Sequence, residues 1–173
     1  PSDFRKAYEF GGVFLFDEID SSAPEALVAF NSALANGHAN FPDGQVQKHP
    51  KCYPMAAANT YGKGADRIYV GRTQLDGSTL DRFAILNMDY DERLEDECVK
   101  AIGGNPLWVK KVQAWRKAVS ELKIRHIISP RASISGAMML RAGESDESVA
   151  QTLVWKGLET GQVDKIKSHS GVK

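Results

Sequence analysis

The length, composition and charge of the chain exclude several classes of protein. Its 173 residues suffice for one domain, or for a medium domain with a small second one, and lysines plus arginines balance aspartates plus glutamates at 22 each. We therefore expect no nucleic-acid or membrane partner, and no apolar run approaches the ~20 residues that cross a bilayer. Cys52 and Cys98 lack metal-ligand spacing, which favours a reducing, cytoplasmic location.

The first part of the sequence predicts a buried strand followed by a helix. Val13-Phe14-Leu15-Phe16 is an unbroken apolar run, typical of a strand covered on both faces in a parallel sheet. Ser22-Ala23-Pro24-Glu25 has the spacing of a capping box. The helix is expected to end at Gly37, and its apolar face carries Leu27, Phe30 and Leu34.

The segment up to residue 90 predicts a hairpin, two more strands and a short helix. Asp43-Gly44 is a favoured turn inside Phe41 to Val46. Met55 to Ala58 is a small-residue strand that ends in Asn59. A glycine-rich loop follows, and after it come a short helix around Thr79 to Arg82 and a third candidate strand, Phe83 to Met88. We expect residues 1–90 to form the α/β part of the protein.

Residues 91–173 predict a small helical bundle. The first helix runs from Asp91 to Ile102, and the second begins at Asn105-Pro106. Its apolar stripe consists of Trp108, Val112, Trp115, Val119 and Leu122. Its basic residues are expected on a solvated face: Lys110, Lys111, Arg116 and Lys117. Two further helices begin at Ser129 and Ser145, and residues 169–173 are expected to fray.

Polar residues follow the two best-defined strands at the ends where ligands bind in parallel sheets. Asp17 and Glu18 follow the first strand, and Asn59 ends the second. In phosphoryl transfer, one acid of such a pair holds Mg²⁺ through water while the other activates the attacking water. An amide can hold that water or a γ-phosphate oxygen. The alternative is a solvated acidic strand end, and Asp20 is expected to cap the following helix.

Two arginines are candidates for contact with a phosphate. Arg131 falls in the first turn of a predicted helix, where a cation is unfavourable by roughly 0.3–1 kcal/mol unless an anion lies nearby. A nucleotide phosphate or a neighbouring carboxylate would supply that anion. Arg82 ends a short helix, from which it can reach a neighbouring subunit, but a surface salt bridge explains it equally well.

Four short motifs, in this order along the chain, resemble those of the AAA+ ATPases. "VFLFDEID" resembles the second acidic nucleotide-binding motif, "AAANT" the sensor-one strand, "LDRF" the arginine-finger region and "SPRAS" the sensor-two helix. The hairpin before "AAANT" is similar to that of the dynein-related and MoxR-like branch. Within that branch, "HPKCYPMAAANTYGKGADRIYVGRTQLDGSTLDRF" looks most like the small ATPase subunit of cobaltochelatase and its viral relatives.

The resemblance implies a fold, cofactors and partners. Residues 1–90 would be the C-terminal part of an AAA+ parallel-sheet nucleotide-binding domain, and residues 91–173 a small helical lid. The cofactors would be ATP and Mg²⁺. The full-length protein would act as a hexameric ring that remodels or loads a protein partner.

The same resemblance implies a role for each candidate residue. Asp17 would hold Mg²⁺ through water, and Glu18 would activate the attacking water. Asn59 would be the sensor-one residue. Arg82 would be the finger acting on a neighbouring subunit, and Arg131 the sensor-two residue acting within its own subunit.

The family's phosphate-binding loop, G-x-x-x-x-G-K-[ST], has no match in the sequence. The only Gly-Lys pair is Gly62-Lys63, which lacks the upstream glycine. Because the chain begins with Pro1 and the acidic strand follows so soon, we expect that loop to lie on an upstream segment. The chain alone is then expected to bind ATP weakly and to be inactive. The resemblance also places the missing first strand between the Met55 to Ala58 strand and the Phe83 to Met88 strand, and the two inner edges left unpaired are expected to pair with another copy or to repack.

Two other classes of function stay open. One is a non-catalytic interaction module derived from the AAA+ fold, which never hydrolyses ATP. The other is a metal-dependent nuclease that uses Asp17, Glu18 and Asp20, although a second carboxylate cluster is missing beside Asn59. In the glycine-rich loop from Tyr61 to Gly77, Arg67 and Arg72 are candidates for partner contact, and plain loop solubility is the alternative for both.

Overall fold

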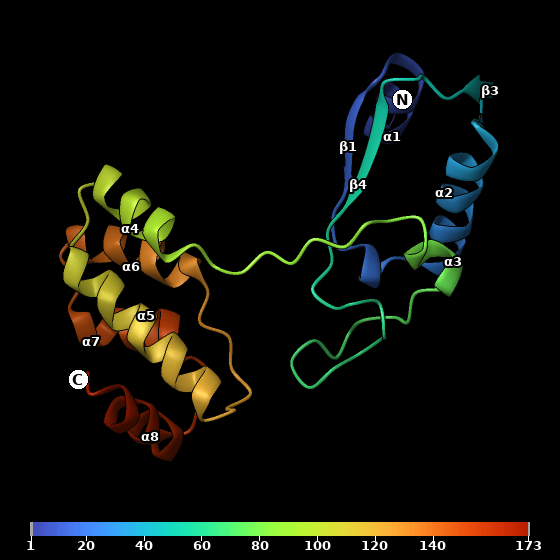
Figure 1. The fold of residues 1–173 in the computed structure, drawn as a ribbon. Helices are drawn as coiled ribbons and strands as arrows, with labels where there is room; N and C mark the ends of the chain where they lie inside the picture. Colours follow the sequence, from blue (N-terminus) through green and yellow to red (C-terminus); the bar gives the residue numbers. More distant parts are fainter. Residues whose placement is uncertain (1, 173) are drawn as a thin grey trace. The chain divides into compact units, whose positions relative to one another are not determined.

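The computed structural model describes residues 2–172, and the chain divides into two compact units, Pro1–Leu86 and Asn87–Lys173 (Figure 1). The first unit is mixed α/β with a small parallel sheet, and the regular elements of the second are all helical. The predicted boundary stands between residues 90 and 91, whereas residues 87–90 belong to the helical unit. Within residues 2–172, none of the helices has both the length and the apolar character needed to cross a membrane.

Two short parallel strands form the centre of the N-terminal unit. β1 (Gly12–Phe16) pairs with β4 (Cys52–Ala56), which begins earlier than the predicted strand and ends at Ala56. The predicted hairpin is confirmed, because β2 (His38–Phe41) pairs antiparallel with β3 (Gly44–Gln47). The two strand pairs form separate sheets.

Helices cover one face of the β1–β4 sheet. α1 (Asp3–Phe10) was not predicted, and it begins after Ser2, whose side chain accepts a hydrogen bond from the Arg5 backbone N–H. α2 (Pro24–Asn36) confirms the predicted helix, and Gly37 ends it in the left-handed conformation. The apolar core under these helices contains Phe4, Phe14, Phe16, Ile19, Leu27, Phe30 and Leu75.

The opposite face of this sheet is bare. Side chains alternate along a strand, so Val13 and Leu15 point away from the phenylalanines and are 63% and 53% exposed. On β4, Tyr53 and Met55 are 59% and 55% exposed. The prediction that the first strand is covered on both faces is therefore wrong, because the N-terminal unit supplies helices to one side only.

Two further predictions for this unit are wrong. Ser22 does not begin a capping box, because it closes the short turn η1 (Ile19–Ser21) and α2 starts after Ala23 without a side-chain cap. Residues 83–88 form no strand. They follow α3 (Gly77–Leu80) as an extended segment, in which Phe83 stacks on Phe30 with ring centroids 6.5 Å apart. Within residues 2–172 no strand edge pairs with this segment.

The helical unit is built around one long helix. α5 (Pro106–Glu121) packs against α4 (Glu92–Ala101), α6 (Pro130–Arg141) and α8 (Thr160–Ser170). The short α7 (Asp146–Val149) continues into a π-helical turn over Ala150–Val154. The predicted apolar stripe is confirmed, since Trp108, Val112, Trp115 and Val119 are buried and Leu122 packs against them.

The end of the chain is packed, and the predicted frayed tail is wrong for the described residues. Ile166 of α8 is fully buried, and the Trp115 Nε1–H donates a hydrogen bond of 3.2 Å to the carbonyl of Val172. α8 was missed because its apolar positions are few among polar ones. These contacts attach α8 to the middle of α5.

A buried ion pair joins three helices of this unit. The guanidinium of Arg116 in α5 donates to both carboxylate oxygens of Glu95 in α4, at 2.6 and 2.8 Å. Ser133 of α6 donates to the same carboxylate, and Arg116 Nε donates to the Ile128 carbonyl at 2.7 Å. Arg116 is thus not on a solvated face as predicted, because its side chain is 13% exposed and its partner 1%.

We expect the stability of the helical unit to decrease as the pH falls below the ordinary pKa of a glutamate, about 4.3. Burial alone raises the pKa of Glu95, but hydrogen bonds from Arg116 and Ser133 outweigh it and hold this pKa below its ordinary value. A carboxyl group whose pKa is lower in the folded protein than in the unfolded chain stabilises the fold when the pH is above its unfolded-state pKa. This stabilisation is lost as the pH falls through the folded-state pKa. All three tryptophans lie in this unit, so denaturation followed by tryptophan fluorescence at pH 7 and pH 3 measures the loss.

Glu95→Gln is expected to lose on the order of 3–5 kcal/mol at pH 7, because it leaves the Arg116 charge buried without its partner. It should also show a smaller difference between the two pH values. Glu97→Gln is the matched control on the same helix, since the Glu97 pair with Arg93 is exposed and contributes at most about 1 kcal/mol. Equal pH dependence in wild type and Glu95→Gln would contradict the assignment.

Gly136→Ala should destabilise the helical unit by about 1–3 kcal/mol, because a Cβ there would lie 2.4 Å from the Trp108 indole nitrogen. Gly161→Ala is the control in another helix, where an added Cβ meets nothing within 4 Å. That variant is expected to gain roughly 0.4–1 kcal/mol, since it reduces the entropy of the unfolded chain. Urea denaturation followed by tryptophan fluorescence compares them, and equal effects of the two variants would be inconsistent with this close packing.

Candidate functional site

The parallel pairing brings the ends of the two strands to one edge of the sheet. The backbone contact continues past the strands, because Ala57 N donates to Phe16 O and Ile19 N donates to Ala57 O, both at 3.0 Å. Asp17 and Glu18 directly follow β1 at this edge, and Asn59 follows the end of β4 after Ala57 and Ala58. All three side chains are exposed. The edge therefore presents two carboxylates and one amide to solvent.

The acid pair lies in a left-handed turn. Glu18 has φ 52° and ψ 43°, one of two positive φ values at non-glycine residues among residues 2–172. Its backbone N–H donates to Asp17 Oδ1 at 3.0 Å, and its carbonyl accepts hydrogen bonds from the Ser21 N–H and hydroxyl at 2.8 and 3.0 Å. A non-glycine residue in this region costs on the order of 1 kcal/mol or more, so surrounding contacts must hold the turn.

Asp20 supplies those contacts, which corrects its predicted role as a helix cap. Its side chain is fully buried, and its Oδ2 accepts hydrogen bonds from the Thr60 N–H at 3.0 Å and from the Thr60 hydroxyl at 2.8 Å. Its backbone carbonyl accepts from the N–H and hydroxyl of Thr73 at 2.8 and 3.1 Å. Asp20 thus joins the end of β1 to the segment after β4, directly beside Asn59.

Arg72 bridges the exposed and the buried acid. Its guanidinium donates to Glu18 Oε1 at 3.2 Å and to Asp20 Oδ1 at 3.3 Å, and its side chain is only 11% exposed. The hydrogen bond to Glu18, together with the charge of Asp20, raises the pKa of Arg72 despite the opposing effect of burial. Neither prediction for Arg72, partner contact or plain solubility, describes this internal bridge. Arg67, in the same loop, is exposed.

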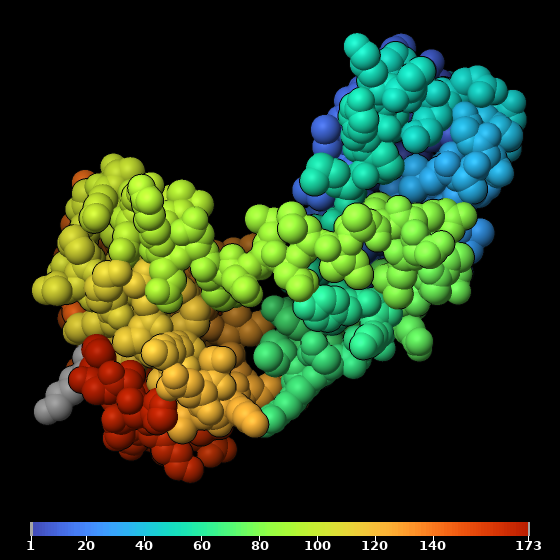
Figure 2. All heavy atoms as spheres, in the orientation of Figure 1, coloured from blue at the N-terminus to red at the C-terminus, as the bar shows by residue number. Residues whose placement is uncertain are grey.

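The sequence carried little signal for this bridge. Arg72 and Asp20 are 52 positions apart, and the loop between Tyr61 and Gly77 has no periodic pattern. An arginine beside a threonine in a glycine-rich loop is equally typical of a solvated segment. The loop lies on the surface of the N-terminal unit (Figure 2), and only its fold brings Arg72 inward.

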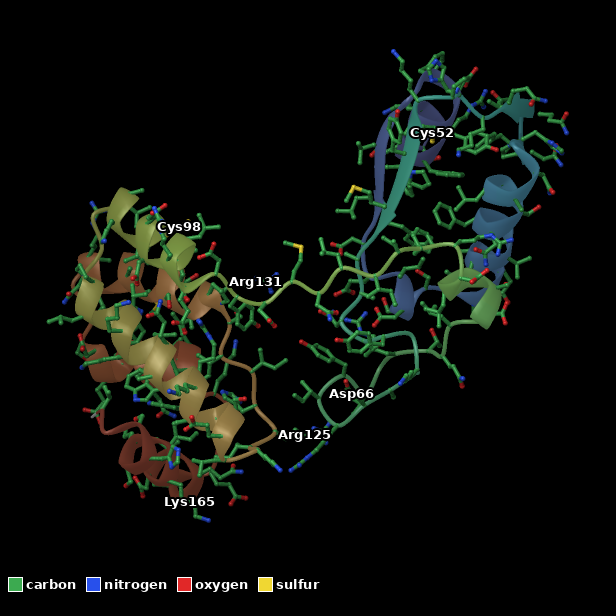
Figure 3. The ribbon with its side chains drawn as sticks, in the orientation of Figure 1. Cys52, Asp66, Cys98, Arg125, Arg131 and Lys165 are labelled. Carbon is green, nitrogen blue, oxygen red and sulfur yellow. The ribbon has the colours of Figure 1, made fainter. Side chains whose placement is uncertain are left out.

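The two other predicted arginines are exposed. Arg82 follows the end of α3, and its guanidinium donates to the carbonyl of Ser78 on the same helix. Arg131 lies in the first turn of α6, as predicted (Figure 3). Among residues 2–172 it has no ion pair or hydrogen bond of its side chain, so the predicted alternative of a local carboxylate partner is not observed.

The donor set at the sheet edge suits one hydrated cation better than a ligand cluster. Mg²⁺ usually keeps several waters and takes one or two carboxylates, and Asp17 offers such a carboxylate at the surface. Within residues 2–172 no group of three or more histidines, cysteines or acids is arranged to hold a metal ion. The carboxylate of Asp20, which the nuclease alternative requires, is engaged by Thr60 and Arg72.

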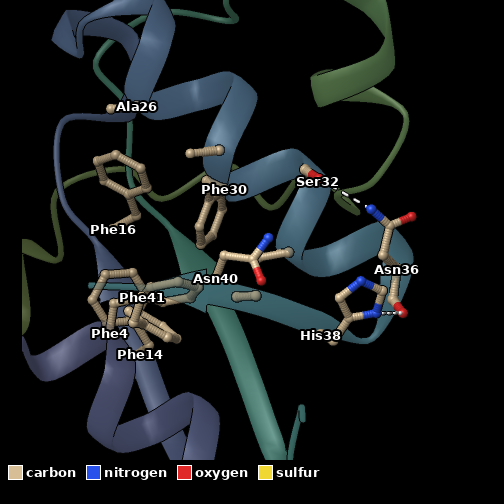
Figure 4. A pocket seen from close by; sticks show the side chains of 13 residues that line it. Phe4, Phe14, Phe16, Ala26, Phe30, Ser32, Asn36, His38, Asn40 and Phe41 are labelled. Carbon is tan, nitrogen blue, oxygen red and sulfur yellow. Dashed lines mark hydrogen bonds between the residues drawn. The ribbon is translucent and has the colours of Figure 1, made fainter. Parts of the chain in front are cut away.

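A separate open pocket of about 570 Å³ lies under α2 (Figure 4). Five phenylalanines dominate its lining, and Asn40 also lines it. None of the acidic-edge residues lines this pocket, although Phe16 directly precedes Asp17. The aromatic residues that line it are Phe4, Phe14, Phe16, Phe30 and Phe41. The pocket is thus an apolar feature on the helix-covered face of the sheet.

Comparisons with known proteins add no relative to this description. No protein-family model matches the chain, and no curated protein matches it. The acidic edge consists of Asp17, Glu18 and Asn59 at the surface, with Asp20 and Arg72 beneath them.

Proposed function

We propose that residues 1–173 are the C-terminal part of an AAA+ ATPase of the dynein-related and MoxR-like branch, similar to the small ATPase subunit of cobaltochelatase. One observation carries the proposal: β1 and β4 pair in parallel, so that Asp17, Glu18 and Asn59 leave the same edge of the sheet. The helical unit is assigned as the lid. The whole protein is proposed to act in the cytoplasm as a hexameric ring that remodels or loads a protein partner.

The acidic edge gives each residue a distinct task in ATP hydrolysis. Asp17 holds a hydrated Mg²⁺ through its exposed carboxylate, and Glu18 accepts a proton from the attacking water. Asn59 orients that water or a phosphate oxygen through its amide. Mg²⁺, when bound, neutralises charge on the phosphate oxygens. The strained turn at Glu18 supports this assignment, because such strain concentrates at functional sites.

The arginines complete the proposal. Arg82 is exposed beyond the end of α3, which suits a residue that reaches a neighbouring subunit's phosphate. Among residues 2–172 the Arg131 side chain has no ion pair or hydrogen bond, and it lies in the first turn of α6, where the positive helix end disfavours a cation unless an anion binds there. Residues 1–173 contain no G-x-x-x-x-G-K-[ST] motif, so the proposal assigns the main phosphate cradle to a segment outside them.

A non-catalytic interaction module is the second candidate. It is favoured by the engagement of Glu18 with Arg72, since a carboxylate bound to arginine is partly withdrawn from a substrate water. The two candidates differ in whether a longer protein that contains this chain hydrolyses ATP.

A protein that extends residues 1–173 with a phosphate-binding segment is expected to hydrolyse ATP. Glu18→Gln should lower kcat by about 10²-fold or more with little change in KM, because it removes the group that accepts the proton. Phosphate release in a steady-state assay measures this. Glu25→Gln, on the exposed first turn of α2, is the matched control and should leave kcat unchanged. Unchanged hydrolysis in Glu18→Gln would remove Glu18 from its assigned role.

Residues 1–173 alone are proposed to self-associate through an open strand edge. β1 pairs on one side only, so the backbone groups of Val13 and Leu15 on its outer edge meet no strand within residues 2–172. On the outer edge of β4, one of the outward-facing residues is Pro54, which has no backbone N–H. The β4 edge therefore lacks one of the hydrogen-bond donors that a new strand would need. The outer edge of β1, beside the bare apolar face, is therefore the better site for pairing.

Wild-type residues 1–173 should form dimers or larger species in sedimentation velocity at about 10–100 μM, a concentration range that detects weak association. Leu15→Lys should shift them towards monomer, because a charge blunts an edge strand. Leu107→Lys is the matched control, since Leu107 is 70% exposed on the helical unit. A wild-type chain that stays monomeric over this range would end the strand-pairing proposal.

A further inference from the structure

Arg72, in the loop after β4, contacts two of the acids that follow β1. Arg72 donates to Glu18 Oε1 at 3.2 Å and to Asp20 Oδ1 at 3.3 Å, and its guanidinium lies 5.9 Å from the Tyr69 ring centroid. The Arg72 side chain is 11% exposed, whereas the Glu18 side chain is 57% exposed. One cation therefore connects a surface carboxylate to a buried one.

The buried acid makes this connection necessary. Asp20 is completely buried, and a buried carboxylate is stable only when it is paired and hydrogen-bonded. Two donors come from Thr60, and the only salt-bridge cation that Asp20 has within the described chain is Arg72. The buried Asp20 thus fixes the position of the Arg72 guanidinium. The same guanidinium in turn holds the Glu18 carboxylate.

These contacts form a continuous path between the two polar strand ends. The path runs from Glu18 through Arg72 to Asp20, and from Asp20 to Thr60, which is bonded covalently to Asn59. A planar guanidinium can serve two carboxylates at once, whereas a lysine ammonium offers a compact charge without that fork. Hydrogen bonds therefore link the Glu18 side chain to Thr60, the residue that follows Asn59 in the chain.

We propose that Arg72 is a positioning residue that fixes the Glu18 carboxylate relative to Asn59. This inference rests on the proposed function, in which Glu18 activates water beside Asn59. Arg72 acts through Glu18 and does not touch the reacting atoms. Misplacement of a reacting group by about 1 Å can lower a rate by 10²-fold, which sets the scale of the effect.

Hydrogen–deuterium exchange of residues 1–173 tests the bridge without any nucleotide. In Arg72→Met, the backbone amides of Thr60 and Thr73, which donate to Asp20, should exchange at least about tenfold faster than in wild type. Arg67→Met is the matched control from the same loop and should leave both amides unchanged. Arg72→Lys should lie between them. Equal exchange in Arg72→Met and Arg67→Met would overturn the proposal.

A double variant separates positioning of Glu18 from neutralisation of Asp20. Asp20→Asn/Arg72→Met has no unpaired buried charge, and its asparagine can still accept a hydrogen bond from Thr60. Exchange of the Thr60 and Thr73 amides should therefore return towards the wild-type rate. In the extended, ATP-hydrolysing protein its kcat should nevertheless stay about 10- to 100-fold low with KM unchanged, because Glu18 is no longer held. A kcat restored to the wild-type value would overturn the positioning role, since neutralising Asp20 would then explain the effect of Arg72.

Failure of the proposed function gives a different pattern. If the extended wild-type protein does not hydrolyse ATP, the function is rejected, and the positioning of Glu18 for hydrolysis is rejected with it. The exchange difference between Arg72→Met and Arg67→Met would persist in that case. Hydrolysis by wild type together with unchanged kcat in Arg72→Met would instead overturn the positioning role alone.

Discussion

The parallel pairing of β1 with β4 determines which polar side chains of the N-terminal unit meet. Parallel strands end at a common edge, so residues far apart in the chain reach the same solvent-facing line. An antiparallel or missing pairing would separate Asp17 from Asn59 by the length of a strand. The backbone bonds at Ala57 extend the pairing just far enough to support the turn at Glu18. The chemistry proposed for this edge exists only because these few backbone contacts form.

Both units use the same physical device to join elements that are distant in sequence. In each, a fully buried carboxylate is paired with a largely buried arginine from another segment: Asp20 with Arg72, and Glu95 with Arg116. The two ion pairs differ in how the arginine distributes its hydrogen bonds. Arg116 donates both its amino groups to one carboxylate at 2.6 and 2.8 Å, which suits a structural tie. Arg72 divides its donors between two carboxylates at 3.2 and 3.3 Å, and one of them is exposed.

The bare apolar face of the β1–β4 sheet complements this polar edge. Parallel sheets normally have both faces covered, and here one face carries the phenylalanine core while the other exposes Val13, Leu15, Tyr53 and Met55. Pro54 interrupts one strand edge, and the outer edge of β1 is continuous. The N-terminal unit thus combines an acidic edge with an exposed apolar surface suited to further strand or helix packing.

Elements whose signals are local could be predicted from the sequence. Apolar periodicity located α2 and the α5 stripe, Asp43-Gly44 located the hairpin, and Asn105 and Ser129 marked helix starts. Tertiary structure alone decided which strand faces are covered, that residues 83–88 form no strand, and that α8 packs on α5. It also decided the internal bridge of Arg72. The reason is that strand pairing and buried ion pairs depend on partners tens of residues away, whose contribution no local pattern records.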